Sequence, residues 1–175
     1  MLEINREWSP IGVDRFYHLV SIGYYQDIAF FRAIKGFMVQ FGIHSNPKVN
    51  AAWKGNPILD EPVKASNTTG TVSFAKGGPN TRTTQLFINT KDNKNLDAMG
   101  FVPLGTVLDM EPNISGLDLV KSLYTGYGEG GPRGKGPNQM YLQQQGKAYL
   151  KQFPKLDYIL STRICKKETP QNPCP

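Results

Sequence analysis

The chain has 175 residues, of which 39% are hydrophobic and 19% charged, with 18 glycines and 13 prolines. This length and composition suit one globular domain with a hydrophobic core, and they exclude two large domains, a disordered chain, a coiled coil and a membrane span. The formal net charge is +6, but the basic residues are scattered and form no stripe interleaved with aromatic residues. We therefore expect no specific nucleic-acid partner.

The first residues predict a strand followed by a helix. Residues 2–5 alternate apolar and polar side chains, as a half-buried strand does. Ser9 and Pro10 then form an N-cap with proline in the first turn, and apolar residues follow at helical spacing until Gly23. Because a sheet protein seldom starts abruptly with a strand, we also expect a further segment upstream of the numbered chain.

Short strands separated by turns occupy the middle of the sequence. Residues 29–40 are rich in Phe, Ile, Val and Met around Gly36, which is typical of two strands joined by a tight turn. Residues 41–68 contain several Pro, Gly and Asn residues and are expected to form a loop. Two more short strands are predicted at 71–75 and 85–88, on either side of a Gly-Gly-Pro-Asn turn.

The second half adds a strand and two helices. Residues 101–108 predict a strand, and a short helix is expected from Ser115 to just before Gly126. After a loop rich in Gly and Pro, Asn138 caps a third helical segment that continues through Leu150. Because strands and helices do not alternate regularly, an antiparallel barrel is favoured over a doubly wound parallel sheet.

The C-terminal part contains a last predicted strand, at 157–164, and then a flexible tail at 165–175. The only two cysteines, Cys165 and Cys174, lie in this tail, where they permit a small disulfide but cannot by themselves hold a structural zinc ion. The numbered chain has no secretory signal, so we expect it in the cytoplasm. A periplasmic or secreted location stays open if the true N-terminus lies upstream.

Common catalytic motifs do not fit this sequence. Residues 126–131 match G-x-G-x-x-G, but they follow a predicted helix and lead into Pro132, whereas a dinucleotide-binding motif follows a strand and opens a helix. These glycines are interpreted as a flexible loop. His18 and His44 have no metal-binding pattern nearby and no nucleophile elbow occurs, so metal-dependent chemistry and hydrolysis by Ser or Cys lack support.

Residues 30–40, FFRAIKGFMVQ, place Arg32 and Gln40 in an otherwise apolar pair of strands. On strand periodicity, these two side chains and either Phe37 or Met38 meet near one face of a hairpin. The alternative is an ordinary arginine on an edge strand, with its stem packed on apolar surface. This segment alone does not decide between the two.

Three segments, in order along the chain, resemble the signatures of one family. Residues 30–40 are similar to F-x-R-x-I-x-G-F-M-x-Q, and residues 71–88, TVSFAKGGPNTRTTQLFI, are similar to G-T-[LV]-[SA]-M-A-x-x-x-P-N-[ST]-x-x-[ST]-Q-F-F-I. The run Leu96-Asp97, followed by Phe101 and Gly105, resembles a third signature. The family is the cyclophilins, which are barrel-type peptidyl-prolyl cis-trans isomerases.

The resemblance implies a mainly β fold: a closed antiparallel eight-stranded barrel, or one with an open seam, with two to three helices. The isomerase domain is expected at 1–164, before the tail at 165–175. The N-terminal strand would match the family's second strand, so the first strand is either upstream or absent. Residues 42–66 and 126–156 resemble a divergent bacterial-type subfamily.

The resemblance also implies an activity. Rotation about an X-Pro amide must overcome a resonance barrier of about 18–20 kcal/mol, and a hydrogen-bond donor aimed at the proline nitrogen stabilises the twisted transition state. Arg32 is the expected donor, with Gln40 as the second catalytic residue; a guanidinium stays charged, so no metal and no cofactor are expected. The expected substrate-binding residues are Phe37, Met38, Ala75, Lys76, Gln85, Phe87, Leu96 and Phe101.

Several alternatives stay open at this point. The alternative for the apolar residues of the expected pocket is ordinary core packing, but the resemblance favours the pocket for Phe37, Met38 and Phe101. The tryptophan that many cyclophilins place before Leu-Asp is Asn95 here, which predicts weak binding of cyclosporin-type cyclic peptides. The expected partners are proline-containing peptides and unfolded or partly folded proteins, bound by a monomer that assists folding. The alternative function is a non-catalytic proline-peptide-binding or chaperone module.

Overall fold

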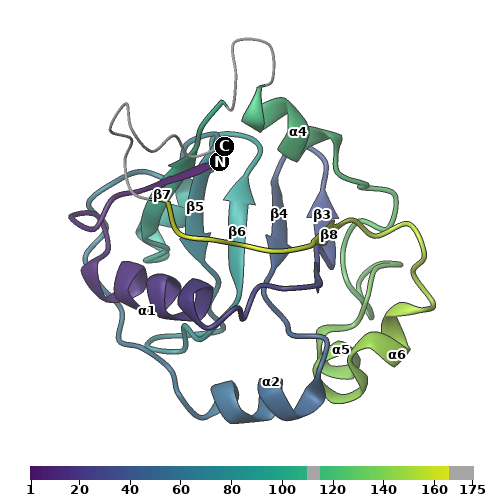
Figure 1. Ribbon diagram of the computed structural model, residues 1–175. Coiled ribbons are helices and arrows are strands. Elements are labelled where there is room, and N and C mark those ends of the chain that lie inside the picture. Colours follow the sequence, from purple (N-terminus) through teal and green to yellow (C-terminus); the bar gives the residue numbers. More distant parts are fainter. Residues whose placement is uncertain (110–114, 166–175) are drawn as a thin grey trace.

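Two antiparallel sheets form the framework of the protein, of which the computed structural model describes residues 1–109 and 115–165. The main sheet has six strands in the order β1-β7-β5-β6-β4-β3, and a small second sheet pairs β2 with β8 (Figure 1). The strands are β1 (Leu2–Ile4), β2 (Ile28–Ala29), β3 (Arg32–Ile34), β4 (Met38–Phe41), β5 (Thr71–Phe74), β6 (Leu86–Asn89), β7 (Pro103–Val107) and β8 (Tyr158–Ile159).

The predicted mainly β, antiparallel fold is confirmed, but the closed eight-stranded barrel is not, because within the described residues the eight strands divide into six and two and the main sheet is open. Its end strands, β1 and β3, pair with β7 and β4 respectively. The division arises at Phe30 and Phe31, which interrupt the predicted strand and carry the chain from the small sheet to the edge of the large one. The backbone N–H of Phe30 donates to Asp157 O at 2.9 Å, on the side of the small sheet.

Six helices lie around the main sheet within the described residues, more than the two to three expected. They are α1 (Pro10–Ser21), α2 (Pro47–Lys54), α3 (Asn95–Ala98), α4 (Gly116–Ser122), α5 (Gln139–Gln145) and α6 (Lys147–Leu150). In Figure 1, α4 lies at the upper end of the sheet and the other long helices lie toward its lower end.

Helix α2 falls inside the segment 41–68 that we expected to be a loop. It begins with a common N-terminal capping pattern: Asn46 is the N-cap, its Oδ1 accepts a hydrogen bond from Lys48 N at 2.9 Å, and Pro47 occupies the first turn. The prolines and glycines on both sides of this pattern favoured a loop. The helix forms because it packs against α5 and because Trp53 packs against the core.

The helical segment expected from Asn138 to Leu150 is two helices. Asn138 caps α5 as predicted, through its Oδ1 and the backbone N–H groups of Met140 and Tyr141. Gly146 has a φ of 57° and ends the helix, because this left-handed conformation does not continue an α-helix.

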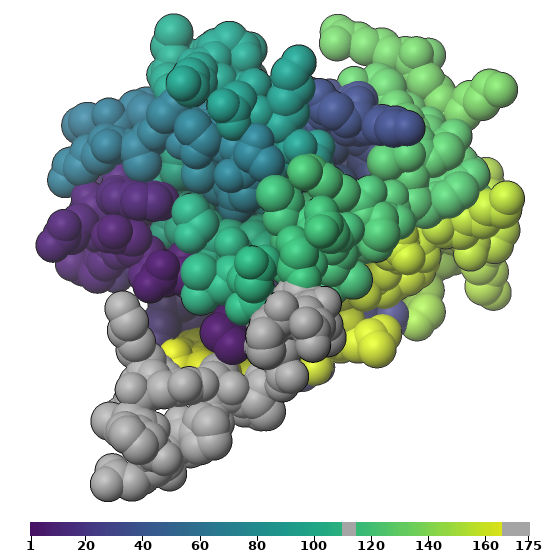
Figure 2. Space-filling view, turned by 90° about the horizontal axis from the view of Figure 1, so that it is seen from above, coloured from purple at the N-terminus to yellow at the C-terminus, as the bar shows by residue number. Residues whose placement is uncertain are grey.

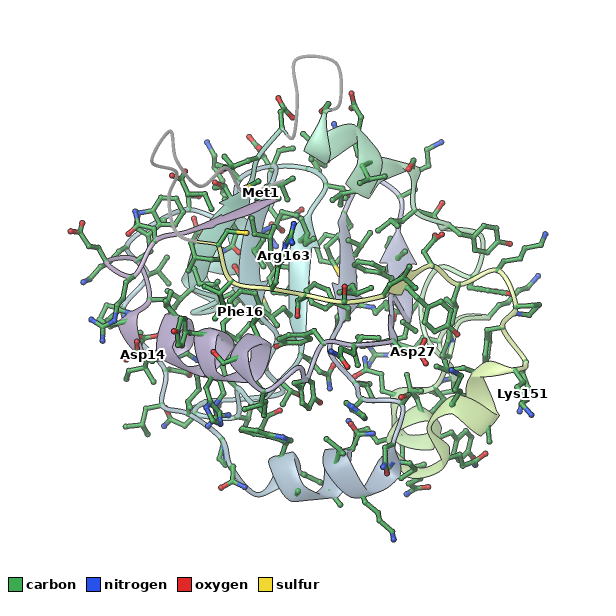
Figure 3. All side chains as sticks on the ribbon, viewed as in Figure 1. Met1, Asp14, Phe16, Asp27, Lys151 and Arg163 are labelled. Atoms are coloured by element: carbon green, nitrogen blue, oxygen red, sulfur yellow. The ribbon has the colours of Figure 1, made fainter. Side chains whose placement is uncertain are left out.

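Helix α1 lies across one end of the sheet, with Phe16 pointing toward the sheet and Asp14 pointing away from it (Figure 3). Ser9 holds the predicted N-cap position, but its side chain does not cap the helix. Its hydroxyl donates to Glu61 at 2.5 Å, and the Glu61 carboxylate accepts from the first backbone N–H groups, those of Ile11 and Gly12. A distant carboxylate therefore caps α1.

The side chains of the sheet belong to different core clusters on its two faces. Val39 belongs to the large cluster under α1, with Leu19, Phe74 and Leu104, whereas its neighbour Met38 belongs to a small cluster with Phe87 and Leu96. Adjacent strand residues point to opposite faces, so this alternation separates the two clusters. The small cluster lies at the surface cavity described below.

The C-terminal strand is shorter than expected. Of the predicted strand at 157–164, only the two residues of β8 pair with another strand, which is β2. Cys165 is disulfide-bonded, whereas Cys174 and the rest of the expected tail, 166–175, lie outside the described residues. Within the described part of the chain, none of the helices has the length and apolar character needed to cross a bilayer.

Candidate active site

The β3–β4 hairpin brings Arg32 beside Gln40. The two residues face each other across the antiparallel pair, and Gly36, with a φ of 69°, turns the chain between them. Arg32 Nη1 donates to Gln40 Oε1 at 3.0 Å and lies 3.9 Å from Met38 Sδ. The proximity predicted from strand periodicity is therefore confirmed.

A third polar side chain continues from this pair. Gln40 lies opposite Phe87 on β6, and its Nε2 donates to Gln85 Oε1 at 2.9 Å. The series Arg32, Gln40 and Gln85 thus joins the two strands of the hairpin to a segment 45 residues further along the chain. Because Gln40 is buried, its amide has a fixed hydrogen-bonding role and holds the guanidinium against the sheet.

The polar series borders an apolar pocket formed by Phe37, Met38, Phe87, Leu96 and Phe101. Met38, Phe87 and Leu96 are buried together, while the other two rings are partly exposed over them. Phe87 and Phe101 meet edge to face with 5.6 Å between their ring centroids. Arg32 Cζ lies 6.0 Å from the centroid of the Phe37 ring. These side chains therefore form one wall and floor, with the guanidinium at the rim.

All ten residues predicted for the site line a single cavity of about 390 Å³. The sequence positions are spread over 70 residues, so only the tertiary structure brings them together. The cavity is lined by the predicted residues Arg32, Phe37, Met38, Gln40, Ala75, Lys76, Gln85, Phe87, Leu96 and Phe101 and by the unpredicted residues Gly77, Thr81, Thr83 and Gln139.

Two predicted binding residues, Ala75 and Lys76, lie at the edge of this cavity with contacts of their own. The Ala75 N–H donates to Gln85 O at 2.9 Å, so this group is used within the protein and is not the one that meets a peptide. Lys76 Nζ donates to Asp60 at 2.9 Å and lies 5.7 Å from the Phe101 ring centroid. The pKa of Asp60 is lowered: burial raises it, but hydrogen bonds from Lys76 and Asn80 N outweigh that effect.

Sequence reasoning missed Glu129, which forms the closest polar contact of Arg32. Its two carboxylate oxygens accept from Arg32 Nε at 2.6 Å and Nη2 at 2.7 Å. The hydrogen bond from Arg32 lowers the pKa of Glu129 despite partial burial, so the carboxylate is ionised at neutral pH. In the sequence this glutamate lies within the glycine run at 126–131, which carried no sign of a contact with β3.

The glycine-rich segment lies beside the β3–β4 hairpin, and Figure 2 shows its green atoms next to the blue atoms of the hairpin. Gly128 forms an isolated antiparallel bridge with Ala33. Among the described residues, no group of three His, Cys, Asp or Glu side chains is arranged to hold a metal ion. The cavity is lined by two cationic side chains, Arg32 and Lys76, by the amides of Gln40 and Gln85, and by an apolar surface.

This site, on this fold, belongs to a known class of proteins. Residues 1–139 match the model of the family described as cyclophilin type peptidyl-prolyl cis-trans isomerase/CLD. The chain therefore belongs to the cyclophilin-type peptidyl-prolyl cis-trans isomerase family, as the three sequence signatures predicted.

Curated relatives agree with this assignment. The chain is 32% identical over 124 residues to peptidyl-prolyl cis-trans isomerase 10 of Caenorhabditis elegans, an alignment that covers 69% of this chain and 76% of the relative. It is 36% identical over 112 residues to human peptidyl-prolyl cis-trans isomerase-like 3, covering 62% and 68%. It spans only 16% of the longer isomerase-like 2 of Aspergillus oryzae, with 40% identity over 92 residues.

Solved cyclophilin structures share the fold. A Cryptosporidium parvum cyclophilin type peptidyl-prolyl cis-trans isomerase, crystallised in the presence of the dipeptide Ala-Pro, matches with a TM-score of 0.54 and 23% identity, covering 70% of this chain and 78% of that chain. The cyclophilin AquaCyp293 of Hirschia baltica matches with a TM-score of 0.54 and 18% identity, covering 73% and 64%.

Proposed function

We propose that this protein accelerates cis-trans isomerisation of X-Pro peptide bonds, with Arg32 as the donor to the proline nitrogen. The observation that carries the proposal is the position of the Arg32 guanidinium at the rim of the apolar cavity, with Nη1 beside Gln40 and Met38. A twisted amide restores the lone pair on the proline nitrogen, and a donor aimed at that atom favours the twisted state over the planar one.

The rest of the cavity suits the other requirements of this reaction. One side of the rotating bond must stay still, and the apolar floor formed by Met38, Phe87 and Leu96 holds a proline ring by contact alone. Gln85 and the backbone of Lys76 lie where the flanking peptide groups pass in this proposal. The Ala-Pro dipeptide present with the C. parvum relative supports proline as the recognised side chain.

The proposed partners are proline-containing peptides and unfolded or partly folded proteins with exposed X-Pro bonds, bound by a monomer. Uncatalysed X-Pro exchange takes tens to hundreds of seconds, which is slow enough to limit folding. Acceleration of this step is a direct way to assist folding.

Exchange NMR on a short X-Pro peptide tests the proposal, with the wild type compared with Arg32→Ala. We expect faster exchange with the wild type and loss of most of the acceleration in the variant. The matched control is Arg6→Ala, which removes an exposed arginine paired with Asp14. If the wild type binds the peptide without accelerating exchange, the protein is a proline-peptide-binding module and the proposed activity is wrong.

A further inference from the structure

The glycine-rich segment at 126–137 contains Glu129, whose carboxylate contacts the candidate catalytic residue Arg32. Glu129 approaches Arg32 from the edge that carries Nε and Nη2, with both contacts shorter than 2.8 Å. Gln40 approaches the opposite edge, at Nη1. A planar guanidinium held on two edges has a fixed plane, whereas one contact alone leaves it free to turn.

The backbone of this segment is built closely around Glu129. Its carbonyl oxygen accepts from Gly136 N at 2.9 Å, and Gly131 N donates back to Gly136 O at 2.9 Å. A Cβ at Gly134 would lie 2.2 Å from Glu129 O, so a larger residue there would push this carbonyl away. The glycines that resemble a dinucleotide motif thus serve a compact turn, and the Gly128 bridge to Ala33 attaches this turn to β3 next to Arg32.

We propose that Glu129 is a positioning residue, which fixes the Arg32 guanidinium so that its remaining N–H donors face the apolar cavity. This inference rests on the proposed isomerase function. A guanidinium has five N–H donors. Glu129 takes two and Gln40 one, and the second N–H of Nη1 has Met38 Sδ, at 3.9 Å, as a weak acceptor, so the donors that remain for a substrate are this one on Nη1 and one on Nη2. Nη1 also lies beside Met38 Sδ, on the cavity side.

Glu129 acts through Arg32 and does not touch the substrate in this proposal. X-Pro rotation breaks no bond and transfers no proton, so a carboxylate here has no acid-base task. Its contribution is to keep the donor in line with the proline nitrogen, and misplacement of a catalytic group by about 1 Å can reduce a rate about 100-fold.

Glu129→Gln tests this role, because glutamine keeps the size of the side chain and one oxygen but loses the charge and the second acceptor. We expect kcat for X-Pro exchange to fall about 10-fold or more, while KM stays within about twofold, since the apolar floor is untouched. The matched control, Glu7→Gln, makes the same chemical change at an exposed glutamate and should leave both constants unchanged.

Two further measurements separate positioning from a purely structural role. The Arg32 Nε–H signal in nitrogen NMR should exchange slowly with water in the wild type and faster in Glu129→Gln. Glu129→Asp keeps the charge with a shorter reach and should recover part of kcat. If the glutamine variant does not fold, Glu129→Asp tests the proposal in its place. A kcat for Glu129→Asp equal to that of the wild type would contradict the need for two close contacts.

The possible outcomes distinguish a failure of the positioning role of Glu129 from a failure of the proposed isomerase function. A wild type without isomerase activity contradicts the proposed function, and the positioning role with it. An active wild type whose Glu129→Gln variant keeps its full kcat, or loses affinity alone, contradicts only the positioning role. An active wild type with a selective fall in kcat and a faster Arg32 Nε–H exchange supports both.

Discussion

Glu61 and Arg82 form a buried ion pair, with 2.9 Å between Glu61 Oε2 and Arg82 Nη2 and exposed side-chain fractions of 6% and 1%. Arg82 follows the turn beside the cavity, whereas Glu61 caps α1 through Ile11 N and Gly12 N. The pair therefore links the N-terminal helix to the segment that carries Thr81 and Thr83 of the cavity lining.

Loss of this pair should destabilise the protein strongly. Glu61→Gln leaves the buried Arg82 without its closest countercharge and removes charge from the cap of α1. We expect the free energy of unfolding to fall by about 3 kcal/mol, the lower end for a broken buried ion pair, because Asp60 Oδ1 still lies 3.6 Å from Arg82 Nε. Urea unfolding measures this, with Glu7→Gln as an exposed control. A change below about 1 kcal/mol would show that the pair contributes little.

The same carboxylate predicts an acid-dependent stability. The pKa of Glu61 lies below its ordinary value of 4.5: burial raises it, but hydrogen bonds from Ser9, Ile11 N, Arg82 and Gly12 N outweigh burial. The unfolded chain thus binds the proton first as pH falls, so the contribution of Glu61 is complete above about pH 4.5 and is lost as pH drops through the lower folded value. Unfolding curves between pH 3 and pH 6 should show this slope, and Glu61→Gln should flatten it.

Asp97 is expected to support the far wall of the apolar cavity. Its carboxylate accepts from Ser66 Oγ and from the backbone and side chain of Asn67, and Asn67 Nδ2 also donates to Phe101 O at 2.8 Å. Asp97→Ala should let Phe101 move and raise KM for the X-Pro peptide about fivefold, equivalent to ~1 kcal/mol of binding. Exchange NMR at several peptide concentrations measures KM, and Asp118→Ala on α4 is the exposed control. An unchanged KM would show that Phe101 does not contribute to peptide binding.

Weak binding of cyclosporin-type cyclic peptides remains a prediction from the sequence. Asn95 is exposed at the first residue of α3, directly before Leu96 of the cavity floor. Asn95→Trp should add an aromatic contact at the rim and strengthen binding about 3- to 10-fold. Titration calorimetry compares the two proteins. Tight binding by the wild type would mean that the missing tryptophan does not decide the affinity.

Gly146 should resist substitution more than an ordinary loop glycine. Its φ of 57° is unfavourable for other residues, and a Cβ there would lie 2.0 Å from Ser45 O. Gly146→Ala should therefore reduce the free energy of unfolding by about 2 kcal/mol or more. Gly55→Ala is the matched control, because Gly55 has a φ of −82° and no atom within 4 Å of its Cβ position. Equal stability of the two variants would contradict this argument.

Local patterns in the sequence were enough to identify most elements and the candidate site. The β3–β4 hairpin followed from the strand-forming residues on both sides of Gly36, and α4 and α5 began at the predicted caps, Ser115 and Asn138. These predictions succeeded because caps, turns and strand alternation depend on interactions within a few residues. The ten site residues were identified through the family signatures that contain them.

Features that depend on distant contacts were not predictable in this way. Helix α2 is stable through its packing on α5, and α1 is capped by Glu61, which lies some 50 residues away. The division of the strands into two sheets depends on which segments meet after Phe31, and no local pattern carries that information.

The sequence by itself determined the family, the hairpin that carries Arg32 and Gln40, and the chemistry available to the site. Only the tertiary structure decided that Glu129 holds Arg32 and that the main sheet is open. The physical reason is that a carboxylate in a glycine-rich turn has no local signal of its partner. The contact arises only when the chain places residues 97 positions apart within hydrogen-bond distance.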